Sequence, residues 1–279
     1  MNILFFGSSS FASQHLVKEF PKNCNLYFFS RRKNKLKNHF QFNLNKDQNI
    51  LQKLKKIKKK IDYIFLFSSH VPLNEKKSNW DICYKTNVLG YINLLKKGDF
   101  NPKKIIHASS CSIYGNQKKN MDEDSITNPD TPYSLSKFLQ ENILRIYCLN
   151  KNIKFLSYRI GYVVGDKMNK KRLLVKFLNK FRCNKKIKIF NKNKNLNLIH
   201  TRDIAKIILS TYKSATGIYN LTREKKTTLS KFMKVLTKLK KYNNKDQMNN
   251  FSSKKLFASY PAIKETNFKE ILNFFKNAN

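Results

Sequence analysis

The chain has 279 residues, 41% of them hydrophobic, and its 57 Lys and Arg residues against 17 Asp and Glu give a formal charge of +40. This length allows one large domain, or a domain with a smaller lobe. No apolar run is long enough to cross a bilayer, and the first residues predict a strand rather than a signal peptide. The five cysteines are scattered without a CxxC pair, so we expect reduced thiols, no metal site and a cytoplasmic location.

The positive charge raises the question of nucleic-acid binding. The excess is almost all lysine, spread along the chain and accompanied by many Asn, Ile and Phe residues, which share A/T-rich codons. We therefore expect no nucleic-acid partner. The lysines are interpreted as solvated side chains whose field attracts anionic ligands.

Short apolar strands alternate with helical segments over the first 160 residues. Strands are predicted at 3–6, 26–29, 40–44, 63–67, 104–108 and 155–158, and helices at 11–20, 50–57, 80–97 and 132–149. Thr131-Pro132 is typical of an N-cap followed by proline at the first helical position. The alternation predicts an α/β fold with a Rossmann-type doubly wound parallel sheet and helices on both faces.

After residue 160 the regularity weakens. Helices are predicted at 173–181, 203–212 and 229–239, and short strands at 187–190 and 218–221. Because no Pro/Gly-rich linker separates this part, we expect a smaller C-terminal α/β lobe at 161–279, integrated with the sheet domain at 1–160.

The first strand runs into a turn of small residues, Gly7-Ser8-Ser9-Ser10-Phe11-Ala12-Ser13, and then into a helix. Backbone N–H groups and the helix dipole at such a turn bind pyrophosphate. Gly7 is what remains of a GxxGxxG pattern, since Ser10 and Ser13 occupy the other two places. Taken alone, the segment fits an ordinary βα turn as well as a dinucleotide site.

The second strand ends in Ser30-Arg31-Arg32. An NAD site places an acid about 20 residues after the glycine turn to bind the ribose 2′-hydroxyl. This chain has no acid between Glu19 and Asp47. Two arginines suit a 2′-phosphate through bidentate hydrogen bonds, so the pair favours NADP over NAD. The competing interpretation is two solvated arginines.

The most specific pattern is a serine-rich segment at 109–115, followed later by Pro132-Tyr133-Ser134-Leu135-Ser136-Lys137. Tyr133 and Lys137 are four residues apart in a predicted helix and share one face. Ser110 follows a predicted parallel strand, at the edge where α/β sheets bind ligands. A nearby ammonium and a positively charged nicotinamide lower the pKa of a tyrosine from about 10. Tyr133 would then exchange a proton with a substrate oxygen held by Ser110, while hydride moves to or from the nicotinamide.

At these residues the chain resembles the extended short-chain dehydrogenase/reductases, the NAD-dependent epimerase/dehydratase family. Thr86-Asn87-Val88-Leu89-Gly90 is similar to a family segment whose Asn supports the active site, and 159–165, 198–205 and 217–221 are similar to later motifs. The resemblance implies a catalytic set of Ser110, Tyr133, Lys137 and Asn87. It implies cofactor contacts from Gly7, Ser9, Ser10, Phe11, Ala12, Ser30, Arg31, Arg32, Asn43, Leu44, Phe67, Ser68 and Ser69.

Several positions depart from the family pattern. Asn43 stands where members usually have an Asp near adenine. Tyr162 replaces an Asn that often contacts the nucleotide of the substrate, and Leu196 lies where UDP-galactose epimerase-like members have a phosphate-binding Arg. Cys111-Ser112 replaces the Asp-Glu pair of the 4,6-dehydratases, which disfavours dehydration.

The resemblance implies an NAD(P)-dependent nucleotide-sugar epimerase or 4-keto reductase, acting in surface polysaccharide synthesis. Residues 1–160 would bind the dinucleotide and 161–279 the substrate. The resemblance also implies a homodimer that pairs the helices at 80–97 and 133–149. The alternative is a catalytically degenerate member that binds a dinucleotide or a partner protein; the degraded glycine turn motivates it, and the intact Ser-Tyr-Lys set argues against it.

Overall fold

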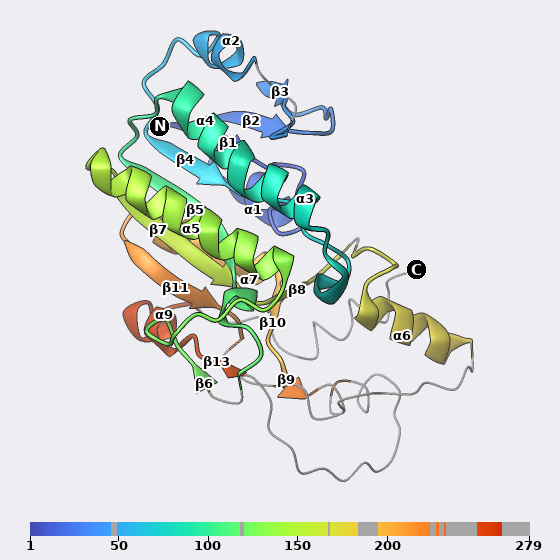
Figure 1. The fold of residues 1–279 in the computed structure, drawn as a ribbon. Coiled ribbons are helices and arrows are strands. Elements are labelled where there is room, and N and C mark those ends of the chain that lie inside the picture. The colour runs from blue at the N-terminus through green and yellow to red at the C-terminus, as the bar shows by residue number, and fades with distance from the viewer. Residues whose placement is uncertain are drawn as a thin grey trace.

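A computed structural model describes residues 1–45, 49–117, 120–166, 168–183, 195–223, 227–228, 232 and 250–263. Seven parallel strands form the main sheet, in the order β11-β7-β5-β4-β1-β2-β3. Their bounds are β1 (Asn2–Phe6), β2 (Asn25–Ser30), β3 (His39–Gln41), β4 (Tyr63–Leu66), β5 (Lys104–Ser110), β7 (Lys154–Ile160) and β11 (Gly217–Leu221). This is the doubly wound Rossmann arrangement that the sequence predicts (Figure 1).

Helices cover both faces of this sheet. One face packs against α1 (Gln14–Glu19) and α7 (Thr201–Thr211), and the other against α2 (Ile50–Lys55), α4 (Gly90–Gly98) and α5 (Pro132–Asn150). Strand β1 serves both cores, because alternate side chains leave opposite faces of a strand. Ile3 and Phe5 join the α1/α7 core, whereas Leu4 and Phe6 join the α4/α5 core.

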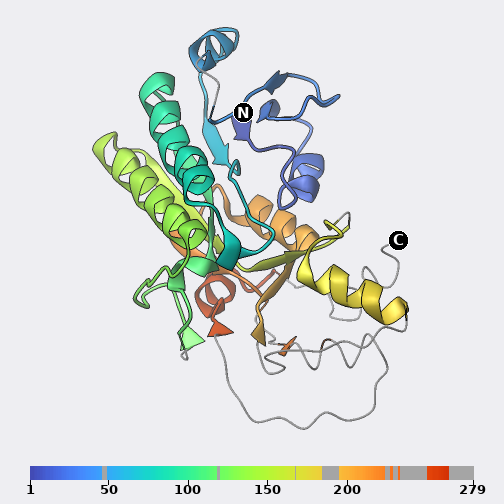
Figure 2. The same cartoon turned by 45° about the vertical axis from the view of Figure 1, so that its right-hand side comes forward.

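Most elements outside the main sheet are short. They are β8 (Tyr162–Val164), α6 (Leu173–Arg182), β9 (Asn195–Leu196), β10 (Leu198–His200), β12 (Thr227–Thr228), β13 (Asn250–Phe251) and α9 (Lys254–Ser259), with β6 (Asn120–Met121) pairing with β13. The chain leaves the main sheet after β7 and returns through α7 to β11, which pairs with β7. Figure 2 shows α6 beside the ends toward which the main strands point. The predicted strand at 187–190 and most of the predicted helix at 229–239 lie outside the described residues.

Two predicted helices differ from the structure. The segment 11–20 is helical only from Gln14, because Ser13 Oγ donates to Gly7 O at 2.9 Å and to Ser10 O at 3.1 Å, which keeps the preceding residues in a turn. The segment 80–97 is interrupted: α3 (Trp80–Tyr84) is followed by a π-type turn over Lys85–Leu89 before α4 begins. Within the described residues, no helix combines the length and apolar character that a bilayer crossing needs.

Candidate active site

The turn between β1 and α1 requires glycine at residue 7. Gly7 has φ +92°, and a Cβ at this position would overlap the backbone of Phe67 and Ser68. Its amide donates to Phe29 O at 2.7 Å. The ends of β1, β2 and β4 therefore meet at this residue, on the carboxyl edge of the sheet.

The rest of the turn is held by serine hydroxyls and leaves backbone donors open. Ser10 Oγ donates to Ser13 Oγ at 2.9 Å, and the Ser10 amide donates to Gly7 O at 2.9 Å. Among the described residues, the amides of Ser9, Phe11 and Ala12 have no protein acceptor, and the buried Ser8 hydroxyl has no partner. A backbone cradle with open donors fits the pyrophosphate of a dinucleotide.

The end of β2 places one arginine near the loop after β4. Burial and the charge of Arg31 lower the pKa of His70 in that loop. The side chains of Arg31 and Arg32 are both exposed. Ser30 is buried, its Oγ donating to Arg32 O at 2.8 Å and lying 2.8 Å from His39 Nε2.

The remaining predicted cofactor residues line the neighbouring loops. Asn43 Oδ1 accepts from the Asn45 amide at 3.1 Å, and Leu44 is buried against Gly90, where a Cβ would leave too little room. Phe67 is buried, Ser68 O accepts from Tyr91 Oη at 2.6 Å, and Ser69 Oγ accepts from Lys137 Nζ at 3.0 Å.

A capping box starts α5 immediately before the catalytic candidates. Thr131 Oγ1 accepts from the Ser134 amide at 3.1 Å, and Ser134 Oγ accepts from the Thr131 amide at 2.9 Å, with Pro132 at the first helical position. The predicted N-cap and helix are confirmed. Tyr133 and Lys137 follow one turn apart, and both are buried, at 5% and 1% exposure.

Tyr133 lies between Ser78 and Ser110. Its amide donates to Ser78 Oγ at 3.2 Å. Burial and the charge of Glu75 raise the pKa of the phenol, whereas a hydrogen bond with the Ser110 side chain and the charge of Arg172 lower it. Ser110 is the last residue of β5, which runs two residues beyond the predicted strand, so Ser110 lies at the carboxyl edge of the sheet.

Lys137 is anchored toward the sheet. Its ammonium donates to Ala108 O at 2.7 Å, to Ser69 Oγ at 3.0 Å and to Gln140 Oε1. Burial lowers the pKa of Lys137 to about 7, against the opposing effect of Glu141. No hydrogen bond joins the Lys137 and Tyr133 side chains, both of which are described, so the influence of the ammonium on the phenol stays a prediction.

Asn87 ties three elements together from within the π-type turn. Its Oδ1 accepts from the His70 amide at 2.8 Å, and its Nδ2 donates to His70 O at 3.1 Å and to Ser136 Oγ at 2.9 Å. The side chain is fully buried. Such turns recur at functional sites because they reorient a side chain inside a helix. Here the amide fixes the loop after β4 against α5.

Sequence reasoning missed three residues of this region. Ser78 holds the start of α5, and Gln140 and His107 lie directly behind Lys137. Gln140 carried a readable signal, since it lies three residues after Lys137 on the same helix face. Ser78 and His107 carried none, because each approaches α5 from a distant part of the chain.

A seven-stranded parallel sheet, a glycine turn after its first strand and a buried Tyr–Lys pair one helical turn apart define a dinucleotide-binding α/β protein of the Rossmann type. Residues 3–221 match the NAD dependent epimerase/dehydratase family, and the chain belongs to that family. The predicted resemblance is confirmed.

Curated relatives share between a quarter and a third of the aligned residues. A UDP-glucose 4-epimerase of Lactobacillus helveticus is 29% identical over 174 residues, covering 59% of this chain and 52% of the relative. A dTDP-D-glucose 4,6-dehydratase of Dictyostelium discoideum is 28% identical, covering 53% and 37%. An uncharacterised protein of Methanocaldococcus jannaschii is 25% identical, covering 90% and 83%. The chain thus spans about half the length, or less, of the first two relatives.

Solved structures confirm the fold. The UDP-glucose 4-epimerase of Thermus thermophilus, solved with NAD, has a TM-score of 0.83 at 17% identity, with 100% of both chains covered. MoeE5 in complex with UDP-glucose and NAD has a TM-score of 0.81 at 17% identity, covering 98% of this chain and 97% of that one.

Proposed function

We propose that this protein is a cytoplasmic NAD(P)-dependent nucleotide-sugar epimerase or 4-keto reductase in which Tyr133 transfers the proton. The observation that carries the proposal is the buried Tyr133 phenol, one helical turn from the buried Lys137 on α5, with Ser110 at the carboxyl end of β5 close enough to lower the pKa of the phenol. Family membership supports the cofactor, and the relatives named for UDP-glucose and dTDP-D-glucose support a sugar nucleotide as substrate.

The chain's own groups divide the work by position. Tyr133 holds a proton at Oη, and burial raises its pKa, which keeps the phenol protonated until a ligand brings further positive charge. Ser110 donates to or accepts from the same substrate oxygen. Lys137 supplies positive charge from behind, and Asn87 keeps the loop after β4 in place. A bound nicotinamide dinucleotide would supply the hydride exchange.

One observation favours the 4-keto reductase, and another favours the epimerase. Arg31 near the loop after β4 supports NADP, the cofactor of a reductase, whereas the relatives named as 4-epimerases support an epimerase. Dehydration is disfavoured because no carboxylate directly follows Ser110. Cys111 is a buried thiol that donates to Arg159 O at 2.9 Å, and Ser112 Oγ lies 2.9 Å from Ser110 Oγ.

The deciding experiment has two stages. The purified protein is titrated with NADPH and with NADH while nicotinamide fluorescence is followed, and it is then incubated with UDP-glucose, dTDP-glucose and their 4-keto derivatives. We expect tighter binding of NADPH and turnover of a UDP- or dTDP-sugar without loss of water. Binding of neither nucleotide would contradict the enzyme. Binding without turnover of any of these sugars would support the catalytically degenerate alternative, and water elimination from dTDP-glucose would identify a dehydratase.

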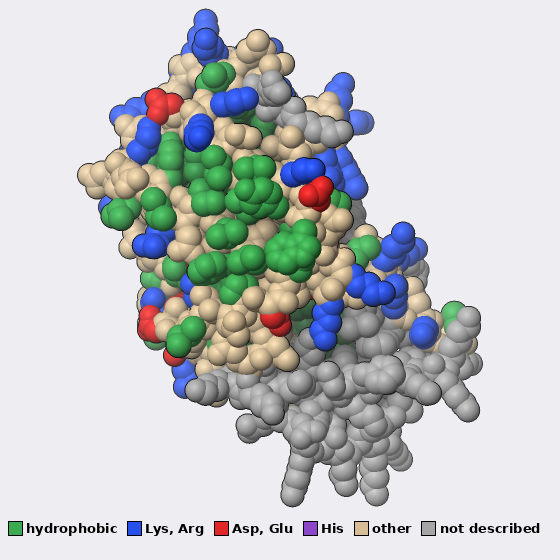
Figure 3. Space-filling model, viewed as in Figure 1, with side chains coloured by type: hydrophobic (Ala, Val, Ile, Leu, Met, Phe, Trp, Pro, Cys, Tyr) green, Lys and Arg blue, Asp and Glu red, His purple; other side chains and the backbone are tan. Residues whose placement is uncertain are grey.

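A homodimer is part of the same proposal. Figure 3 shows an apolar patch over the face formed by α3, α4 and α5. Its exposed side chains include Trp80, Ile82 and Tyr84 on α3 and Ile146 and Leu149 on α5, with Trp80 at 63% and Leu149 at 72% exposure. A patch of this kind marks an interface. A second copy covers it with the same patch across a two-fold axis, the commonest closed arrangement.

Sedimentation at micromolar concentration tests the dimer. The native chain should sediment as a dimer, and the Trp80→Glu variant as a monomer. Ile126→Lys is the matched control, since Ile126 is 83% exposed and lies on none of these helices, so its dimer should persist. A monomeric native chain would contradict the proposal.

A further inference from the structure

A continuous buried hydrogen-bond chain extends from Lys137 into the sheet. The Lys137 ammonium donates to Gln140 Oε1, and the same oxygen lies 3.1 Å from His107 Nε2. On the other side of the ring, His107 Nδ1 lies 3.1 Å from Ser157 Oγ, whose hydroxyl is 2.8 Å from Glu141 Oε2. None of these five residues is more than 2% exposed, so the chain is shielded from bulk solvent.

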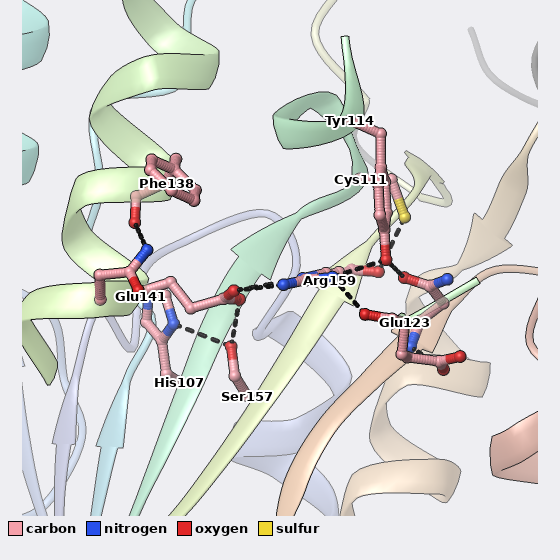
Figure 4. Close-up of polar contacts among 10 residues, drawn as sticks. His107, Cys111, Tyr114, Glu123, Phe138, Glu141, Ser157 and Arg159 are labelled. Carbon is pink, nitrogen blue, oxygen red and sulfur yellow. Dashed lines mark hydrogen bonds and ion pairs between the residues drawn. The ribbon is translucent and has the colours of Figure 1, made fainter. Parts of the chain in front are cut away.

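The fold itself aligns this chain. His107 and Ser157 are register partners on β5 and β7, so their side chains leave the same face of the sheet. Gln140 and Glu141 meet them from α5. Figure 4 shows Ser157 between His107 and Glu141, with Arg159 reaching the carboxylate of Glu141.

The charges along this chain are unevenly paired. Arg159 donates to Glu141 Oε1 through Nη2 at 2.9 Å and through Nε at 3.2 Å, so that carboxylate is neutralised. The three acceptors of Lys137, described above, are all neutral oxygens. Lys137 is therefore a buried cation whose direct hydrogen-bond partners are all neutral, and the carboxylate of Glu141 acts on it only through space.

When His107 is neutral, this hydrogen-bond chain has one proton fewer than its acceptors need. The ammonium fixes the Gln140 amide with its oxygen toward Lys137, so His107 must present its N–H at Nε2. His107 Nδ1 is then a bare acceptor. Both it and Glu141 Oε2 need the one hydroxyl proton of Ser157. An imidazolium would satisfy both of these acceptors, since Nδ1–H would donate to Ser157 and Ser157 to Glu141, whereas Gln140 Nε2 has no partner in either state.

The positive charge of Lys137 opposes a second proton on the His107 ring. Burial and the charge of Lys137 hold the pKa of His107 well below its usual range, against the hydrogen bond with Gln140. The titratable or charged side chains that face the ring are Lys137 and Glu141 from α5, Tyr91 from α4 and, beyond Glu141, Arg159 from β7. Glu141 and Arg159 cancel, and burial raises the pKa of Tyr91, which keeps it neutral.

We propose that Lys137 and His107 bind at most one titratable proton between them: His107 stays neutral while Lys137 is an ammonium, and can take up a proton only where that charge is absent. Each group exchanges its proton with water, and Gln140 transfers none; its oxygen couples the two by accepting from both. The pair therefore never places two positive charges behind Tyr133, which makes His107 a positioning residue for the role proposed above for Lys137.

The test observes His107 directly and needs no turnover. Protein labelled with 15N- and 13C-histidine is compared by NMR with its Lys137→Met variant, and the His107 signals are assigned from their loss in His107→Phe. In the native protein we expect a neutral ring protonated on Nε2 from pH 5 to 8. In Lys137→Met, the midpoint for protonation of this ring should rise by at least about one pH unit, the shift that one buried neighbouring charge produces. A native ring protonated on Nδ1, or a Lys137→Met ring still neutral at pH 5, would overturn the proposal.

A second variant tests the link through Gln140. In Gln140→Met the acceptor at Nε2 is gone, so the ring should move its proton to Nδ1 and donate to Ser157, which satisfies the remaining contacts. A ring that keeps its proton on Nε2 would contradict the coupling. His39, which lies on β3 away from this chain, should be unchanged in every variant. If the protein binds neither NADPH nor NADH, the proposed function is refuted. The His107 ring signals would still test the coupling between Lys137 and His107.

Discussion

The two edges of the main sheet each carry a buried lysine, and the lysines differ in what they bind. Lys104 begins β5 at the amino edge and is 2% exposed. Its ammonium donates to Tyr212 O at 2.9 Å and to Lys213 O and Ala215 O at 2.7 Å, the carbonyls that follow α7. Lys137, at the carboxyl edge, binds one carbonyl and two side chains.

This difference separates a structural cation from a reactive one. Backbone carbonyls at a helix end accept hydrogen bonds and cannot donate, so they favour the ammonium form of Lys104 and cap α7, while burial and the charge of Lys154 lower the pKa of Lys104 to about 8. The hydroxyl of Ser69 and the amide of Gln140 can reorient, which allows Lys137 to change its protonation state. The amino edge should therefore respond to mutation in stability, and the carboxyl edge in activity.

The largest effect is expected at Tyr133. Tyr133→Phe removes the proton that the reaction needs, so kcat should fall by about 10²–10⁴-fold, the usual contribution of general acid–base catalysis. Binding of the dinucleotide should be unchanged. Tyr147→Phe is the matched control on α5, because Tyr147 Oη donates to Phe100 O at 3.0 Å, far along the helix from the site. Equal turnover in native and Tyr133→Phe proteins would remove Tyr133 from the mechanism.

Lys104→Met should reduce stability without reducing activity. It leaves two buried carbonyls and one partly buried carbonyl without their donor, which costs about 1–3 kcal/mol in the free energy of unfolding. Turnover per folded molecule should match the native protein. Urea denaturation and a standard assay on the same preparation measure both. A variant of native stability would show that the two lysines are not distinguished in this way.

The pH dependence of stability sharpens the comparison for Lys137. Its folded pKa is about 7, below the value of about 10.4 in an unfolded chain, so between these values the unfolded state binds more protons. The free energy of unfolding should therefore rise with pH, by about 2 kcal/mol more between pH 7 and 9 in the native protein than in Lys137→Met. Parallel denaturation curves for the two proteins at both pH values would contradict this difference.

The smallest effect concerns cofactor choice. Arg31→Ala should weaken NADPH binding by about tenfold, the equivalent of one charge-assisted hydrogen bond, and leave NADH binding within about twofold. Lys33→Ala, another exposed cation just past β2, should change neither. Equal losses for both nucleotides would assign Arg31 a general electrostatic role, with no selection for the 2′-phosphate.

The strands and the catalytic spacing were predictable because their signals are local. Apolar runs place β1, β4 and β5 to within one or two residues, and the four-residue spacing of Tyr133 and Lys137 places both on one face of α5. Other features depend on partners far away in the chain. Helix α1 starts late because Ser13 binds Gly7 O, and His107 meets Ser157 only once β5 and β7 are in register. A single sequence contains no signal for such pairings.

The π-type turn at Lys85–Leu89 makes this helix sensitive to length as well as to composition. Removing one residue from it would restore regular α-helical winding and abolish the wider turn that carries Asn87. The Asn87 amide would then lose its present position against His70 and Ser136. A single-codon deletion here should therefore be less tolerated than any substitution at the exposed positions of the same segment.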